Sequence, residues 1–200
     1  MKKIIPGTTE MFRDPLVWIE LKRIIPLVIK GDFFRICHVG CSTGEEVFSM
    51  LILLEEIGFL DKAKIIAFDI NQESIGDLGM GICNKVNSDF FDINYKRYGG
   101  GKNFRDFFKK GENGIIFNPF LLGKVQFYSW DLFNGDFGEY DIIFCRNILT
   151  YYNGELRDKA WGIFYESLNK GGLLVLGFTS IKMDNRFKVF NEKLNIYIRD

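Results

Sequence analysis

The side chains most suited to chemistry in this sequence lie in one short stretch, residues 35–46. There an apolar run leads into the turn Gly40-Cys41-Ser42-Thr43-Gly44, and a helix that begins with Glu45 and Glu46 follows directly. The N-terminus of a helix attracts anions such as a pyrophosphate, whereas carboxylates in the first helical turn repel them. We therefore expect the turn to bind a ligand that carries positive charge.

S-adenosylmethionine meets this requirement, because it has a nucleoside at one end and an ammonium and a sulfonium group at the other. A glycine turn flanked by carboxylates suits such a molecule, so a methyl donor is the leading candidate for the ligand. A nicotinamide-dependent oxidoreductase is a more distant alternative, since it would have to place a pyrophosphate beside Glu45 and Glu46.

The strands and helices that would position this turn alternate along the sequence. Apolar runs predict strands at 33–39, 64–68, 125–128, 140–145 and 173–178, and helical patterns predict helices at 15–29, 44–57, around Ile75 and Leu78, and at 155–168. This alternation is typical of an α/β fold whose mostly parallel sheet is covered by helices on both faces. The tail, residues 186–198, should add an antiparallel edge of two strands.

Local signals mark the ends of some of these elements. We expect Asp14 to cap the first helix and Pro15 to lie in its first turn, while Gly171-Gly172 should end the last helix. Residues 79–123 break the rhythm and are expected to form an irregular insertion with a small β-hairpin around Asn118-Pro119.

Polar residues follow several of the predicted strands, where ligands bind in open sheets of this kind. Asp69 comes after the second strand, and its carboxylate can accept hydrogen bonds from both ribose hydroxyls. Asp131 follows the 125–128 strand and could accept from the adenine amino group, with Ile70 and Leu132 as apolar walls. The sequence therefore predicts a nucleoside pocket at this edge of the sheet.

Four groups of residues, in order along the chain, resemble the CheR family, S-adenosylmethionine-dependent methyltransferases that esterify glutamate side chains of chemotaxis receptors. They are the segment from Thr8 to Asp14 (TTEMFRD), the turn from Gly40 to Glu46 (GCSTGEE), Phe144-Cys145-Arg146-Asn147 with Tyr151-Tyr152, and Gly171-Gly172 through Leu176-Gly177. The resemblance spans nearly the whole chain. It implies a Rossmann-like class I methyltransferase fold in a single domain, residues 1–200, with the N-terminal motif and first helix in residues 1–30.

The resemblance, together with the strand-end argument, assigns residues to the S-adenosylmethionine site. The expected cofactor-binding residues are Thr9, Arg13, Gly40, Ser42, Thr43, Glu45, Asp69, Ile70, Asp131, Leu132, Arg146 and Asn147. Arg13 and Tyr151 would lie nearest the methyl group and are the expected catalytic residues, and no metal is expected.

The reaction implied by the resemblance is a direct displacement that leaves S-adenosylhomocysteine. A glutamate carboxylate has a reference pKa of about 4.3 and is ionised at neutral pH, so no strong general base is needed. Orientation alone is worth roughly 7–11 kcal/mol, and removal of water from the nucleophile adds to it. We therefore expect Arg13 and Tyr151 to hold and orient the reactants rather than to transfer protons.

Composition narrows the possible partners. The 200 residues are 47% hydrophobic, which suits one sizeable core, and the 26 basic and 26 acidic residues argue against nucleic acid or an anionic membrane surface as partner. The four cysteines lack the spacing of a zinc site or a disulfide framework, and no apolar run reaches the roughly 20 residues of a membrane span. We expect a cytoplasmic protein with reduced thiols and no direct membrane insertion.

The chain departs from the family pattern in three places. It begins almost at the N-terminal motif, where family members carry a helical domain that engages the receptor, so a separate helical partner could serve target recognition. Gly7 and Asp131 replace asparagines of the family, and Gly177-Phe178-Thr179-Ser180 replaces its GHSE ending. Two other functions stay open: a non-catalytic module that senses S-adenosylmethionine or S-adenosylhomocysteine, and a methyltransferase of small molecules.

Several residues also have a purely structural interpretation. Asp69 could cap a helix, Arg146 could pair with Asp141 or Glu45, and His38, the only histidine, is expected to be a packed strand residue. The phenylalanines are expected to be chiefly core, although the cluster Phe104, Phe107 and Phe108 could form a docking patch for a protein.

Overall fold

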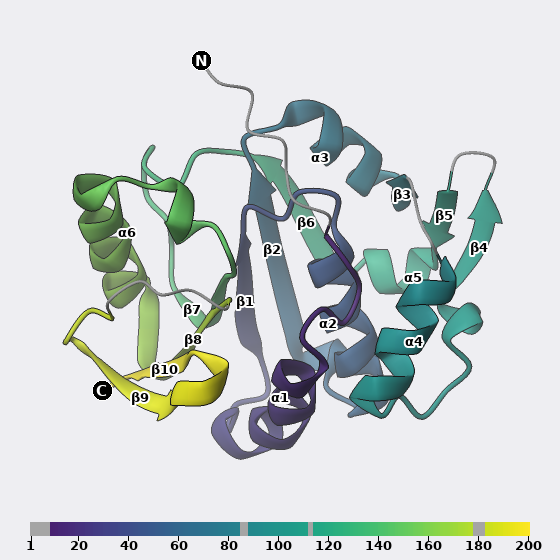
Figure 1. The fold of residues 1–200 in the computed structure, drawn as a ribbon, viewed down its shortest axis with the longest axis horizontal. Helices are drawn as coiled ribbons and strands as arrows, with labels where there is room; N and C mark the ends of the chain where they lie inside the picture. Colours follow the sequence, from purple (N-terminus) through teal and green to yellow (C-terminus); the bar gives the residue numbers. More distant parts are fainter. Residues whose placement is uncertain (1–8, 85–87, 112–113, 178–182) are drawn as a thin grey trace.

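A seven-stranded sheet forms the centre of the computed structural model, which describes residues 9–84, 88–111, 114–177 and 183–200 (Figure 1). Its order is β6-β2-β1-β7-β8-β10-β9. The strands are β1 (Phe34–Val39), β2 (Ala63–Asp69), β6 (Val125–Ser129), β7 (Tyr140–Cys145), β8 (Leu168–Leu176), β9 (Phe187–Asn191) and β10 (Ile196–Arg199). The first five in this order are parallel, and β10 pairs antiparallel with β8 and β9. The predicted α/β class with an antiparallel C-terminal edge is confirmed.

Helices cover both faces of this sheet, α6 on one side and α2 and α4 on the other (Figure 1). Their bounds are α1 (Pro15–Val28), α2 (Glu45–Glu56), α3 (Gln72–Gly79), α4 (Ser88–Tyr98), α5 (Pro119–Leu122) and α6 (Gly154–Ser167). Side chains alternate along β1, so Ile36 lies in the core beneath α2 whereas Cys37 lies in the core beneath α6. Burial on both faces explains why these strands are almost wholly apolar.

A second, three-stranded antiparallel sheet lies within the predicted insertion, in the order β3-β5-β4. It consists of β3 (Ile82–Asn84), β4 (Phe108–Gly111) and β5 (Gly114–Phe117), and Phe117 stacks on Phe48 of α2 with 4.0 Å between ring centroids. Four 3-10 helices complete the described elements: η1 (Leu60–Lys62), η2 (Phe104–Phe107), η3 (Leu149–Tyr151) and η4 (Glu192–Leu194).

The insertion is more regular than predicted. Its hairpin joins β4 to β5, whereas Asn118 begins α5, because the Asn118 side chain accepts a hydrogen bond from the Phe120 N–H at 3.0 Å. The Phe104, Phe107 and Phe108 cluster is at most 9% exposed and packs in the core, so the docking patch was a wrong expectation.

The end of α6 also differs from the prediction. The helix ends at Ser167, and β8 begins at Leu168 and runs through Gly171-Gly172. Between the pairs Tyr140–Leu168 and Ile142–Leu173, β8 has more residues than β7, and the glycines lie in this irregular stretch. Gly171, with a φ of 78°, therefore permits an irregularity within β8 and does not end the helix.

Candidate functional site

The carboxyl ends of β1, β2 and β6 are tied together at one edge of the sheet. The Cys41 N–H donates to the Phe68 carbonyl and the Trp130 N–H donates to the Asp69 carbonyl, both at 3.0 Å. These bonds hold the turn after β1 and the loop after β6 against the end of β2. The strand ends that the sequence predicted to meet are therefore neighbours in the structure.

Asp69 is fixed at the centre of this edge. Its Oδ2 accepts from the Ser42 N–H at 2.8 Å, and its Oδ1 accepts from the Asn71 N–H at 3.0 Å. Asn71, not Asp69, caps α3, because the Asn71 side chain accepts from the N–H groups of Glu73 and Ser74. The carboxylate keeps lone pairs for further donors, since each oxygen can accept more than one hydrogen bond.

The glycines of the turn after β1 are required by the backbone and by their neighbours. Gly40 has a φ of 64°, and a Cβ there would lie 2.2 Å from Ile148 Cδ1 and 4.0 Å from Asp69 Oδ2. Gly44 has a φ of 87°, and a Cβ there would lie 2.3 Å from Leu78 Cδ2. Any side chain at either position would displace the turn from its packing against the segment after β7 or against α3.

The residues expected around the adenine base differ in exposure. Ile70 is 76% exposed and offers free apolar surface beside Asp69, whereas Leu132 is only 3% exposed and belongs to the core beneath α6. Asp131 Oδ1 accepts from the Phe133 N–H at 3.0 Å. Ile70 and the two aspartates thus present the apolar surface and acceptors that a nucleoside needs.

Glu45 binds protein groups in the structure. Its carboxylate accepts from the Thr9 hydroxyl, from Thr43 Oγ1 at 2.7 Å and from Cys83 Sγ at 3.5 Å, and the residue is 4% exposed. The Thr9 and Thr43 hydroxyl oxygens lie 2.8 Å apart, and both lie against the Glu45 carboxylate. Glu45 therefore ties the N-terminal segment and β3 to the turn after β1.

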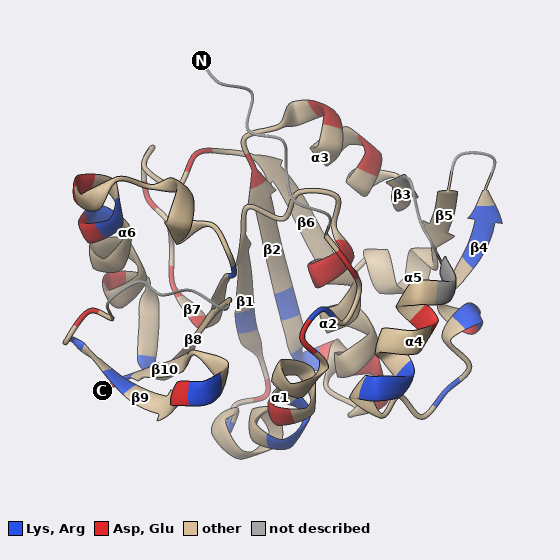
Figure 2. Cartoon of the chain, in the orientation of Figure 1, with Lys and Arg blue, Asp and Glu red and all other residues tan. Residues whose placement is uncertain are grey.

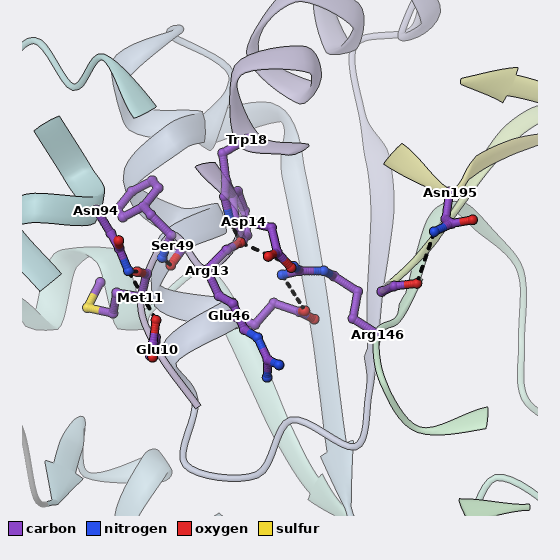
Figure 3. A network of polar contacts seen from close by, with 12 residues as sticks. Glu10, Met11, Arg13, Asp14, Trp18, Glu46, Ser49, Asn94, Arg146 and Asn195 are labelled. Carbon is purple, nitrogen blue, oxygen red and sulfur yellow. Dashed lines mark hydrogen bonds and ion pairs between the residues drawn. The ribbon is translucent and has the colours of Figure 1, made fainter. Parts of the chain in front are cut away.

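Glu46 belongs to a second set of paired charges (Figure 3). His38 Nδ1 lies 2.8 Å from Glu46 Oε1, and Arg146 donates to Glu46 Oε2 at 3.3 Å and to Asp14 Oδ2 at 2.6 Å. Burial alone would raise the pKa of Glu46, but the hydrogen bonds and charges of His38 and Arg146 outweigh it and hold that pKa below its ordinary value. Arg146 is thus a structural pair for Asp14 and Glu46, whereas the sequence suggested Asp141 or Glu45.

The segment of residues 9–14 is anchored along its length. Met11 and Phe12 are fully buried; the Phe12 N–H donates to Ser49 Oγ at 2.8 Å, and Asn94 donates to the Met11 carbonyl at 3.2 Å. Phe12 and Asp14 have φ values of 52° and 58°, which are strained for residues other than glycine. Asp14 makes no side-chain cap to α1, because its carboxylate pairs with Arg146 instead.

The backbone of Arg13 is held by hydrogen bonds, whereas its side chain has no partner among the described residues. Its carbonyl accepts from Trp18 Nε1 at 2.9 Å and from Arg146 Nη2 at 3.1 Å. Its guanidinium points away from the Arg146–Asp14 pair and forms no ion pair or hydrogen bond with any residue that the structure describes (Figure 3). This is the arrangement expected of a cation available to a ligand.

Two neighbouring tyrosines after β7, Tyr151 and Tyr152, differ in their exposure. Tyr151 is 56% exposed, while Tyr152 is half-buried and packs on Phe133 with 5.1 Å between ring centroids. Burial, and then the negative charges of nearby groups that include Asp131 and Asp69, raises the pKa of Tyr152. Tyr152 therefore belongs to the acidic edge, and the Tyr151-Tyr152 pair was the signal that could have identified it.

Asn147 is fitted closely against β8. Its φ is 61°, and a Cβ on Gly177 would lie 2.1 Å from Asn147 Oδ1. Of the other positions singled out in the sequence, Gly7 and Thr8 and residues 178–180 lie outside the described residues.

Charges are distributed unequally between the two ends of the central strands (Figure 2). Asp69 ends β2 and Glu45 and Glu46 begin α2, whereas Arg35 and Lys64 stand near the beginnings of β1 and β2. Arg13 and Arg146 also belong to the candidate site, but Arg146 is paired with Asp14 and Glu46. The side of the site formed by Asp69 and Glu45 is therefore acidic, and a cationic group suits it better than a polyphosphate.

A groove adjoins this edge, because Phe68, Ser129 and Trp130 at the ends of β2 and β6 contribute to its lining. It has a volume of about 390 Å³, and aromatic residues, among them Phe68, Trp130, Phe137 and Tyr140, make up half of its lining. In the described part of the chain, no cluster of histidine, cysteine or acidic residues is suited to a metal ion, and no helix has the length and apolar character needed to span a membrane.

Comparisons with known proteins agree with this geometry. Residues 7–196 match the family model described as "CheR methyltransferase, SAM binding domain". Relatives include "Putative methyltransferase Cher3" of Pseudomonas putida, 37% identical over 171 residues, with 84% of this chain and 63% of the relative covered. Another is "Chemotaxis protein methyltransferase 2" of Vibrio cholerae, 30% identical over 171 residues, with 82% and 56% covered. The chain thus spans about three fifths of the length of these relatives.

The chain also has a weaker similarity to solved structures. PKMT2 from Rickettsia typhi is 16% identical with a TM-score of 0.48, covering 86% of this chain and 26% of that one. N-methyltransferase NodS from Bradyrhizobium japonicum, in complex with S-adenosylhomocysteine, is 12% identical with a TM-score of 0.44, covering 84% and 62%.

Proposed function

Because the chain belongs to the CheR family and contains its S-adenosylmethionine-binding domain, we propose that it transfers methyl groups from S-adenosylmethionine to glutamate carboxylates of a chemotaxis receptor or a related signalling protein. The observation that carries the proposal is the acidic edge, where Asp69 is fixed by Ser42 and Asn71 next to the exposed Ile70.

The residues present fit the cofactor. Asp69 retains acceptor capacity for ribose hydroxyls, Asp131 can accept from an adenine amino group, and Ile70 offers an apolar surface to the base. The negative charges of this edge suit an ammonium and a sulfonium group. When bound, S-adenosylmethionine supplies an electrophilic methyl group.

Arg13 and Tyr151 are the residues that we propose orient the acceptor. The Arg13 guanidinium has no partner among the described residues, and a guanidinium binds a carboxylate through two parallel hydrogen bonds. Tyr151 is exposed and carries a hydroxyl group that can donate a second contact. The acceptor carboxylate is already ionised at neutral pH, so these residues need only to hold it and exclude water.

The protein substrate is supported by the names of the relatives, several of which are called chemotaxis protein methyltransferases. Two alternatives remain distinct: a module that binds the cofactor without catalysis, and an enzyme that methylates small molecules.

The direct test supplies the full chain with methyl-labelled S-adenosylmethionine and extracts rich in chemoreceptors. A base-labile methyl ester on protein would support the proposal. Binding of S-adenosylhomocysteine without any transfer would favour the non-catalytic module, whereas label in a base-stable or low-mass product would favour another acceptor.

A further inference from the structure

His38, the penultimate residue of β1, is an unusual residue for a buried central strand. It lies in β1 with no exposed surface, and its ring stacks on Phe144 with 4.5 Å between centroids. Its Nε2 has no hydrogen-bond partner in the described residues, whereas its Nδ1 lies 2.8 Å from Glu46 Oε1. A buried imidazole with an unsatisfied nitrogen costs free energy that an aliphatic residue would not, so the contact with Glu46 is the feature to explain.

The ionisation of Glu46 determines which of the two residues donates the hydrogen bond between His38 and Glu46. The pKa of Glu46 lies below its ordinary value, so this carboxylate is ionised at neutral pH. An ionised carboxylate only accepts hydrogen bonds, and His38 Nδ1 must therefore carry the proton and donate. This bond fixes one oxygen of Glu46 and leaves the other to Arg146.

Arg146 connects the fixed carboxylate of Glu46 to the N-terminal segment, residues 9–14. Its side chain is 4% exposed, its Nη1 holds Glu46, and its Nη2 holds both Asp14 Oδ2 and the Arg13 carbonyl. The strained left-handed backbone at Phe12 and Asp14 lies on either side of that carbonyl. The direction in which the Arg13 side chain leaves the backbone thus depends on a guanidinium held between two carboxylates.

We propose that His38 is a positioning residue for methyl transfer: it holds Glu46 on Arg146, and so keeps the Arg13 guanidinium free for the substrate carboxylate. Without the His38 donor, one oxygen of Glu46 loses its partner and Glu46 is free to turn away from Arg146, whose Nη2 binds the Arg13 carbonyl. The Arg13 backbone would then lose its fixed position, and the guanidinium would no longer be held in the direction of the substrate carboxylate. The inference rests on the proposed function only in its last step, the effect on transfer.

The structural part is tested by hydrogen–deuterium exchange of the full chain in three variants. His38→Ala removes the donor, His38→Asn keeps an N–H near the position of Nδ1, and Ile36→Val trims the same face of β1 without touching the charges. We expect exchange in residues 9–14 to become at least about tenfold faster in His38→Ala alone, a difference of roughly 1.4 kcal/mol in opening. Equal acceleration in Ile36→Val, or none in His38→Ala, would overturn the proposal.

The catalytic part is tested by separating binding from turnover in the same variants. We expect His38→Ala to lower kcat at least about tenfold while the affinity for S-adenosylhomocysteine stays within about threefold, and His38→Asn to recover most of kcat. An unchanged kcat in a folded His38→Ala protein would overturn the role in transfer. If the unsubstituted chain transfers no methyl group at all, the proposed function fails, while the exchange experiment still decides the role of His38.

Discussion

At the scale of single residues, the free guanidinium of Arg13 is the group most directly linked to the proposed chemistry. Its backbone carbonyl is bound by Trp18 and Arg146, so the residue is held in place while its side chain has no partner among the described residues. A side chain with no structural partner can be removed at little cost to the fold.

Arg13→Ala should therefore leave the chain folded and lower kcat by about 10–100-fold, a loss of roughly 1.4–2.7 kcal/mol of transition-state stabilisation. Arg23→Ala is the matched control, because Arg23 lies on the surface of α1 and, among the described residues, its side chain pairs with Glu20 alone. The measurement is methyl transfer under saturating S-adenosylmethionine. Full activity in Arg13→Ala would exclude Arg13 from orienting the acceptor.

Glu46 gives a prediction for the pH dependence of stability. Its pKa in the folded chain is below its ordinary value of 4.5, so its contribution to the free energy of unfolding is complete above pH 4.5 and is lost as the pH falls through the folded-state value. Denaturant unfolding of Glu46→Gln should show a stability deficit at pH 7 that narrows toward pH 3. Glu155→Gln, on the exposed start of α6, is the control. A deficit that stays constant with pH would contradict the role assigned to the Glu46 pairs.

At the scale of elements, the turn between β1 and α2 depends on glycine for two separate reasons. Gly40 combines a left-handed backbone with a close approach of Ile148. Gly58 has a similar backbone, with a φ of 71°, but no atom lies within 4 Å of a Cβ placed there.

A comparison of Gly40 with Gly58 distinguishes the free-energy cost of a left-handed backbone from the additional cost of crowding by a neighbouring side chain. Gly58→Ala should cost about 1–2 kcal/mol from the left-handed backbone alone, and Gly40→Ala should cost about 2–5 kcal/mol because overpacking against Ile148 adds to it. Equilibrium denaturation of both variants measures the difference. Equal costs would mean that the turn moves freely away from Ile148, and the rigid positioning of Ser42 and Asp69 would then be in doubt.

The central strands and their carboxyl ends could be predicted from the sequence because both depend on local patterns. Apolar runs mark strands buried on two faces, and the residue after each run lies at the ligand-binding edge by the geometry of a parallel sheet. α4 escaped prediction although Phe91, Tyr95 and Tyr98 have helical spacing and are buried, because the run Gly99-Gly100-Gly101 and the scattered aromatics around it indicated an irregular segment.

The charge pairs could not be predicted, for a different reason. Asp14 and Arg146 are 132 residues apart in the chain, and Glu46 and Arg146 are 100 apart. Only the folded sheet brings them together, so the sequence identified Arg146 as a functional or paired residue but named the wrong partners. The same holds for the burial of Leu132 and for the anchoring of Thr9 on Glu45.

At the scale of the whole molecule, three parts of the chain that are distant in sequence contact the acidic edge. The 9–14 segment reaches it through the bond between Thr9 and Glu45, and the small sheet reaches it through the bond between Cys83 and Glu45. The segment after β7 reaches it through Ile148, which lies close to Gly40. That these parts form one domain, and that a helical partner completes target recognition, remain predictions. Both concern a chain that spans about three fifths of the length of its relatives.

The account depends most on the claim that this edge binds S-adenosylmethionine and its product. Isothermal titration of the full chain with S-adenosylhomocysteine tests this directly, with Asp69→Asn as the site variant and Asp61→Asn, an exposed aspartate paired with Lys124, as the control. We predict a dissociation constant at or below about 10 μM, weakened at least tenfold in Asp69→Asn and unchanged in Asp61→Asn. No measurable binding, or equal binding by all three proteins, would contradict the account.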